Sequence, residues 1–145
     1  MIDNQIKFDL LKTELELVQR QIDKYDQLSA TVKTWTVTLW AAIFGWSFQS
    51  KQQGLILIAL FIVLIFWVID AVNKNFRQDY KARRAEIAQA LQEYFKNSEF
   101  SSEMVAPRIP DHTWFGVLKY VLEPHIFLIY SALIIVSLLS FFVQK

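Results

Sequence analysis

Residues 55–69 read LILIALFIVLIFWVI, a run without a single charged side chain, and with its flanks the apolar block extends over 54–72. A bilayer core of about 30 Å requires about 20 apolar residues in one helix. Two further charge-free blocks are close to this length: TWTVTLWAAIFGWSFQ at 34–49 and IFLIYSALIIVSLLSFFV at 126–143. The sequence therefore predicts a membrane protein with three spans.

The predicted fold class is all-α. In lipid every backbone amide needs a partner within the protein, which leaves helices or a closed barrel, and the alternating strands of a barrel are absent. No proline or glycine occurs before Gly45, and none from 73 to 97. We expect a long antiparallel hairpin over 1–97, with a cytoplasmic coiled-coil arm (1–33), two spans (34–49 and 54–72) and a cytoplasmic helix (73–97). A loop (98–113) and a segment 114–145 follow, the latter either an interfacial helix (114–122) before the third span or one kinked helix.

Lysine and arginine predict the orientation. The arm and the stretch from 73 to 113 are rich in both, whereas the turn SKQQG between the first two spans carries only Lys51. Loops that carry the excess of Lys and Arg stay on the cytoplasmic side. We expect a multi-pass membrane protein with its N-terminus in the cytoplasm and its C-terminus outside.

A heptad-like seam runs along the arm. Apolar residues alternate three and four positions apart, as in a left-handed coiled coil. The core of this seam is Leu11, Leu15, Val18, Ile22 and Tyr25. It either joins subunits or forms the inner face of the hairpin, where the turn at Lys51 would place Leu91 near Leu11 to Leu15. A second stripe, made of Ile6, Leu10 and Leu17, favours a homo-oligomer.

The first span carries a face of small or mildly polar side chains, at Thr34, Thr38, Ala41, Gly45 and Gln49. In membranes such faces let helix backbones approach closely and form hydrogen bonds. The face therefore has two interpretations, which are helix packing and, repeated around a ring of subunits, the lining of a narrow pore.

A basic stripe follows the second span, at Lys74, Arg77, Lys81 and Arg84. Anionic lipid headgroups are its expected partners. The alternative partners are an anionic activator, such as a nucleotide, or an acidic cytoplasmic protein. Duplex nucleic acid is not expected, because the stripe lies against the membrane and near several aspartates.

Three polar residues fall within or beside apolar blocks: Asp70, Glu123 and His125. Acids inside a membrane often mark ion pathways, but Asp70 has candidate partners for a structural role, namely Lys74 at i+4 and Thr34, Thr38 or Trp35 across the hairpin. Glu123 and His125 flank Pro124 and are interpreted as a solvated pair. Two such groups fall short of the three or four protein ligands of zinc, so no metal site is predicted.

No catalytic motif is present. The chain contains no Walker A sequence, no GxGxxG, no GxSxG and no HExxH. The motifs that ATPases, dehydrogenases and hydrolases commonly use are therefore absent from this sequence. The sequence predicts neither an enzyme nor a cofactor.

The order of elements resembles a known family. A long cytoplasmic helix, two spans joined by SKQQG, and a charged helix containing YKARRAEIAQALQEYF are similar to the SLATT-type two-span proteins of bacterial conflict systems. The resemblance covers 1–97, and the third span departs from the two-span plan. It implies a pore-forming or membrane-perturbing effector in antiphage defence, and hence a place in the bacterial inner membrane. Together with the helical stripes and the basic stripe, this predicts a homo-oligomer gated from the cytoplasm. The alternative is a non-conducting anchor that recruits a soluble partner through its cytoplasmic helices.

Overall fold

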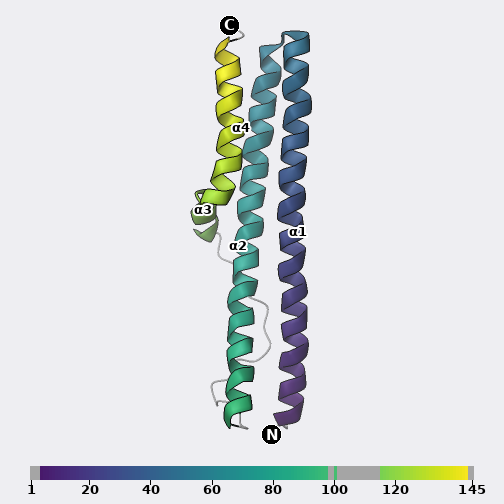
Figure 1. The fold of residues 1–145 in the computed structure, drawn as a ribbon, viewed down its shortest axis with the longest axis vertical. Helices are drawn as coiled ribbons and strands as arrows, with labels where there is room; N and C mark the ends of the chain where they lie inside the picture. The colour runs from purple at the N-terminus through teal and green to yellow at the C-terminus, as the bar shows by residue number, and fades with distance from the viewer. Residues whose placement is uncertain (1–3, 98–99, 101–114, 144–145) are drawn as a thin grey trace. The chain divides into compact units, whose positions relative to one another are not determined.

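The computed structural model describes residues 4–97, 100 and 115–143, and all regular structure in these residues is helical. The all-helical prediction is thus confirmed for this part of the chain. The helices are α1 (Asn4–Ser50), α2 (Gln53–Asn97), α3 (Phe115–Val121) and α4 (Pro124–Val143) (Figure 1). The predicted loop 98–113 lies outside the described residues except for Phe100, and so does the expected start of the interfacial helix at Trp114.

Both long helices continue without a break through the boundaries that hydropathy marks in the sequence. α1 joins the arm to the 34–49 block, and α2 joins the 54–72 block to 73–97. The turn between them is short, and Lys51 adopts a φ of 52° there. A left-handed residue directly after a helix is a common way to end it, although glycine usually occupies that position. The backbone amide of Leu55 then donates to the Gln52 carbonyl at 3.1 Å in the first turn of α2.

The described residues form two compact units, which are taken here one at a time. Unit 1 comprises residues 4–26, 76–97 and Phe100, and unit 2 comprises 27–75 and 115–143.

Unit 1 is a pair of helical segments around an aliphatic core. Leu11, Val18, Ile22 and Ile87 are almost completely buried, and Leu91 packs against them. Each such side chain contributes about 1.5–3 kcal/mol when it leaves water. The ring of Phe8 lies 5.6 Å from that of Tyr94 and extends the core. The pairing of Leu91 and Ile87 with the seam agrees with the register predicted from the turn.

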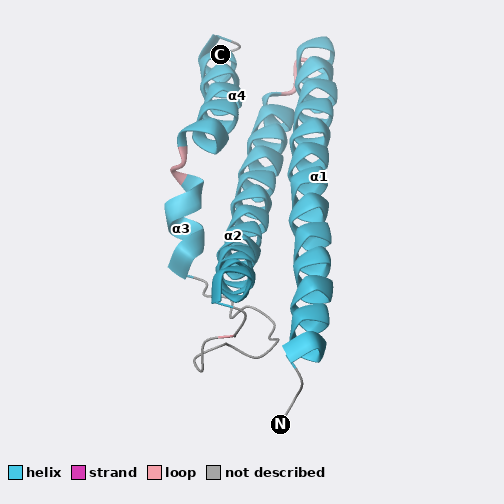
Figure 2. Ribbon diagram, turned by 60° about the horizontal axis from the view of Figure 1, so that its bottom comes forward, coloured by secondary structure: helices cyan, strands magenta, loops and turns pink. Residues whose placement is uncertain are grey.

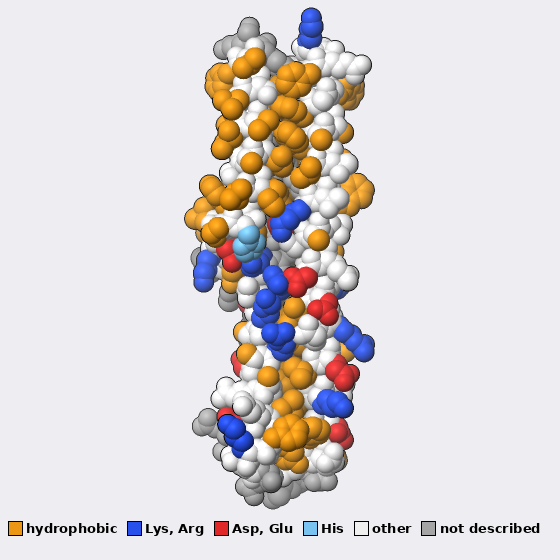
Figure 3. All heavy atoms as spheres, in the orientation of Figure 1, with side chains coloured by type: hydrophobic (Ala, Val, Ile, Leu, Met, Phe, Trp, Pro, Cys, Tyr) orange, Lys and Arg blue, Asp and Glu red, His pale blue; other side chains and the backbone are white. Residues whose placement is uncertain are grey.

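Unit 2 packs segments of α1, α2 and α4 around Val63, Ile126 and Tyr130. Aromatic rings of α1 and α2, among them Trp40 and Trp67, cover this core. Figure 3 shows hydrophobic side chains on the outer surface of α4 and its neighbours. In α4, Leu128, Leu139 and Phe142 are among the most exposed.

Two described helices, α2 and α4, are long and apolar enough to cross a membrane. α1 does not pass this test, because threonine, serine and glutamine lower the hydropathy of its 34–49 block. A crossing by this block stays a prediction.

α3 and α4 are separate helices, as one of the two sequence-based alternatives expected (Figure 2). Pro124 is the first residue of α4, a position where its missing amide hydrogen costs nothing. The amide of Phe127 donates to the Glu123 carbonyl at 2.8 Å and closes the first turn.

Gly116 allows α3 to approach α2 closely. A Cβ at this position would overlap the side-chain oxygen of Asn75, which is 5% exposed. We expect Gly116→Ala to lower the free energy of unfolding by about 1–3 kcal/mol, because a buried side chain must move. Thermal unfolding followed by circular dichroism measures this effect.

Gly54→Ala is the matched control, because a Cβ at Gly54 meets no atom within 4 Å. It should raise stability by about 0.5–1 kcal/mol through helix propensity alone. Equal effects of the two substitutions would contradict the proposed contact.

Candidate functional site

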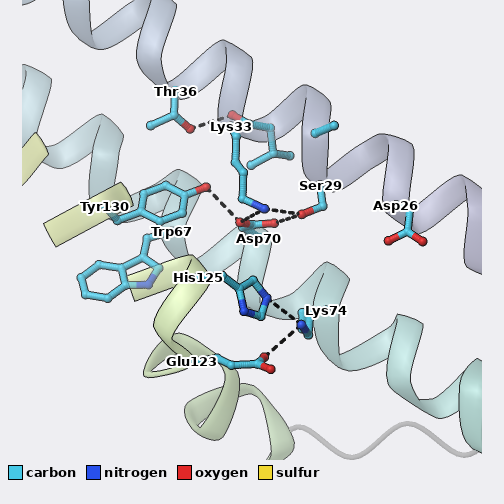
Figure 4. Close-up of polar contacts among 12 residues, drawn as sticks. Asp26, Ser29, Lys33, Thr36, Trp67, Asp70, Lys74, Glu123, His125 and Tyr130 are labelled. Carbon is cyan, nitrogen blue, oxygen red and sulfur yellow. Dashed lines mark hydrogen bonds and ion pairs between the residues drawn. The ribbon is translucent and has the colours of Figure 1, made fainter. Parts of the chain in front are cut away.

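A buried carboxylate joins three helices of unit 2. Asp70 of α2 is completely buried. Its oxygens accept hydrogen bonds from the hydroxyl of Ser29 in α1 and, at 3.3 Å, from the hydroxyl of Tyr130 in α4. The Lys33 ammonium lies 3.3 Å from the same carboxylate (Figure 4). These four residues, Ser29, Lys33, Asp70 and Tyr130, are called the Asp70 cluster below.

Helical spacing explains how α1 supplies its part of this cluster. Ser29 and Lys33 are one turn apart, and the Lys33 ammonium also donates to the Ser29 hydroxyl at 3.0 Å. Thr36 continues the same face, fully buried, with its hydroxyl on the Val32 carbonyl. In α4, the ring of Tyr130 stacks parallel to that of Trp67 at 5.9 Å. Contacts other than those with Asp70 therefore also hold the Ser29 and Tyr130 side chains in position.

A second cluster holds the start of α4 against α2. The Lys74 ammonium lies 3.1 Å from the Glu123 carboxylate and 2.7 Å from Nε2 of His125. An ammonium can only donate hydrogen bonds, so Nε2 of His125 is the acceptor in this contact. We call Lys74, Glu123 and His125 the Lys74 cluster.

Two tryptophans complete the polar connections within unit 2. The indole of Trp40 in α1 donates to the Ser137 hydroxyl in α4 at 2.8 Å. The indole of Trp67 in α2 donates to the Val121 carbonyl at the end of α3, at 3.1 Å. These two contacts link different pairs of helices, so the unit is held by directional bonds in addition to apolar packing.

The partners predicted for Asp70 were wrong. Lys74 contacts Glu123 and His125 instead, and Trp35 is 56% exposed. Thr34 and Thr38 lie on the outer side of α1, whereas the side facing α2 carries Ser29 and Lys33. Sequence reasoning missed Lys33, although the hairpin register places it opposite Asp70. It also missed Tyr130, because no register could be predicted for the third apolar block.

The predicted pore-lining residues share one face of α1, and all of them are exposed: Thr34, Thr38, Ala41, Gly45 and Gln49. A Cβ added at Gly45 would meet no atom within 4 Å. This face lies opposite the buried positions Thr36 and Ser47. It is thus left uncovered by the rest of the described chain.

The coiled-coil seam lies inside unit 1. Leu11, Val18 and Ile22 are buried against α2, Leu15 packs beside them, and Tyr25 stacks on Tyr80 with ring centres 5.8 Å apart. Of the two roles considered for this seam, oligomer interface or inner face of the hairpin, these contacts correspond to the second. The offset stripe of Ile6, Leu10 and Leu17 is about half exposed.

The basic stripe is partly neutralised within the chain. Lys74 belongs to the cluster described above, and Arg77 pairs with Asp26 at 2.7 Å. Lys81 is half-buried. Arg84 is exposed and donates only to the neutral Gln19 side chain, at 3.0 Å. The stripe therefore offers an external anion fewer cations than its sequence indicates.

Arg83, which lies outside the predicted stripe, is the most buried cation of unit 1, at 3% exposed. Its guanidinium binds both oxygens of Glu14 at 2.8 and 3.1 Å, and it binds Glu86 at 2.9 Å. The hydrogen bonds to Glu14 raise the pKa of Arg83 above its ordinary value. Its position directly before Arg84 gave no signal that the two arginines face different surroundings.

In the described part of the chain, no three His, Cys, Asp or Glu side chains gather closely enough to hold a metal ion. The clusters can bind neighbouring helices together through charge and hydrogen bonds. Comparison of the chain with protein-family models, curated proteins and solved structures found no match.

Proposed function

We propose that this chain is an inner-membrane protein whose copies assemble into a pore, or a membrane-perturbing effector, gated from the cytoplasm. In this proposal α2 and α4 cross the bilayer, and the 34–49 block of α1 crosses beside them. The N-terminus lies in the cytoplasm and the C-terminus outside. Antiphage defence is the biological setting that the resemblance to SLATT-type proteins implies.

The observation that carries the proposal is the uncovered face of α1. α1 is less apolar than α2 and α4, yet its polar positions divide into two sets. One set, including Ser29, Lys33 and Thr36, forms hydrogen bonds within unit 2. The other set, with Thr38, Gly45 and Gln49, remains exposed. Lipid is a poor environment for such a face, whereas neighbouring copies or a water-filled path suit it.

In this proposal the Asp70 cluster holds the pore closed. An ion pair in an apolar setting is costly to separate, because each freed charge must then be solvated. While Lys33 and Asp70 remain paired, α1 is held to α2 and α4. Movement of α1 relative to those helices, as pore opening requires, must break or rearrange this pair. The cluster therefore favours a single closed arrangement until an activator binds.

Bulky substitutions on the α1 face test the proposal. Expression of the wild-type chain in bacterial cells should depolarise their membrane, and Gly45→Leu or Thr38→Leu should reduce this signal at least tenfold by filling the path. A Cβ at Gly45 meets no atom of the described residues within 4 Å, so this variant is expected to keep the packing within the subunit. A voltage-sensitive dye reports depolarisation, and mass in detergent reports assembly.

Ala132→Leu is the matched control, because Ala132 is an exposed small residue of α4. It should depolarise cells as the wild type does. Full depolarisation by both α1 variants would contradict the proposal that this face of α1 lines the pore.

The exposed stripe of Ile6, Leu10 and Leu17 in unit 1 favours a second candidate, a non-conducting anchor that recruits a soluble protein. This candidate expects no depolarisation by any variant. It also expects Leu10→Glu to release a co-purifying protein while the membrane potential stays unchanged.

A further inference from the structure

Unit 1 contains a groove between α1 and α2 with a volume of about 600 Å³. Ligand pockets typically range from about 300 to 1,000 Å³, so the groove fits a small molecule. Leu15 and Ala88 are its apolar lining residues. Its polar lining residues are Glu16, Gln19, Arg20 and Arg84.

The two arginines of this groove differ from the other arginines that the structure describes. Arg77 and Arg83 pair with carboxylates. Arg20 and Arg84 are exposed, and neither has a carboxylate partner within ion-pair distance among the described residues. Arg84 is instead held by the amide oxygen of Gln19 at 3.0 Å, which orients the guanidinium without neutralising it.

We propose that this groove binds a soluble phosphate ester with an apolar body. The guanidinium groups of Arg20 and Arg84 meet the phosphate oxygens, a pairing that the planar, permanently charged group favours. The apolar body of the ligand lies on Leu15 and Ala88. Glu16, on the same groove, repels the phosphate and weakens the binding. The site replaces the predicted basic stripe as the place for an anionic activator, because Arg20 of α1 joins Arg84 while Lys74 and Arg77 are occupied.

Phosphorus NMR of naphthyl phosphate tests the proposal with the full chain in a phosphate-free maltoside detergent. The resonance should broaden and saturate with wild-type protein. Arg20→Gln and Arg84→Gln should each raise the dissociation constant about tenfold, as expected for the loss of a charge-assisted bond. Lys24→Gln removes a cation from an exposed position of α1 outside the groove and should change the constant less than twofold.

Glu16→Gln should lower the dissociation constant several-fold, an increase in affinity that damage to the fold would not produce. No saturable broadening with wild-type protein, or equal constants for Arg84→Gln and Lys24→Gln, would overturn the proposal. Nanodiscs provide the second arm. The protein is placed in nanodiscs made of equal parts of phosphatidylglycerol and phosphatidylcholine, or of phosphatidylcholine alone. If naphthyl phosphate is displaced only in the nanodiscs that contain phosphatidylglycerol, the groove binds a lipid headgroup, and the proposal of a soluble ligand is wrong.

Control of the pore by this ligand rests on the proposed function, but binding does not. Gly45→Leu protein should bind naphthyl phosphate with the wild-type constant although it fails to depolarise cells. If the wild type binds naphthyl phosphate but does not depolarise cells, the proposed pore is contradicted and the proposed binding site is kept. If the wild type depolarises cells but does not bind naphthyl phosphate, only the proposed binding site is contradicted.

Discussion

Asp70→Ala is expected to lower the free energy of unfolding by about 3 kcal/mol, because it leaves the Lys33 ammonium without its partner in an apolar unit. It also removes the acceptor of the Ser29 and Tyr130 hydroxyls. Asp70 is completely buried and the Lys33 side chain is 27% exposed, so water can replace the lost contacts only on the Lys33 side. Unfolding by dodecyl sulfate in mixed micelles, followed by circular dichroism, measures the change.

Two comparisons separate the ion pair from the general cost of the substitution. Asp9→Ala removes an exposed carboxylate of α1 and should cost less than about 0.5 kcal/mol. The double substitution Lys33→Met with Asp70→Leu should recover most of the loss, because it leaves no unpaired charge. If the double variant lost as much free energy of unfolding as the two single substitutions added together, the ion pair would not be the source of the effect.

Arg83→Met is expected to destabilise unit 1 by about 3 kcal/mol, because it removes a buried guanidinium that binds both Glu14 and Glu86. The Glu14 side chain is only 12% exposed and accepts two hydrogen bonds from Arg83. Amide hydrogen exchange read by mass spectrometry should therefore show lost protection in peptides from 4–26 and 76–97.

Arg84→Met is the matched control for Arg83→Met, one residue further along α2 but exposed. It should change the free energy of unfolding by less than about 0.5 kcal/mol. If both arginine substitutions reduced protection equally, the burial of Arg83 would not explain its role.

The hairpin could be predicted from the sequence because two strong signals agree. The 3,4 spacing of the seam identifies which side of α1 is apolar, and the short turn at Lys51 sets the register. The pairs Gln19 with Arg84 and Asp26 with Arg77 follow this register within one residue. The same rule places Lys33 and Thr34 opposite Asp70 within one residue, so it could not by itself select Lys33, which is the ion-pair partner in the structure.

The packing of α4 could not be predicted in the same way. Its sequence is apolar on all sides, so no periodic pattern indicates which face is buried. Tyr130 and Ser137 meet Asp70 and Trp40 through contacts that no spacing rule in one helix can indicate. The neutralisation of Lys74 has a similar cause, since Glu123 and His125 reach it from a distant part of the sequence.

The exposed face of α1 separates the pore from the anchor most directly. Current through planar bilayers containing the purified protein, together with its mass in detergent, is the decisive measurement. Discrete currents from a wild-type oligomer of defined mass, and none from a Gly45→Leu oligomer of the same mass, are the predicted result. A wild-type oligomer that carries no current with or without naphthyl phosphate, or equal currents from the Gly45→Leu oligomer, would contradict the proposal that this face of α1 lines a pore.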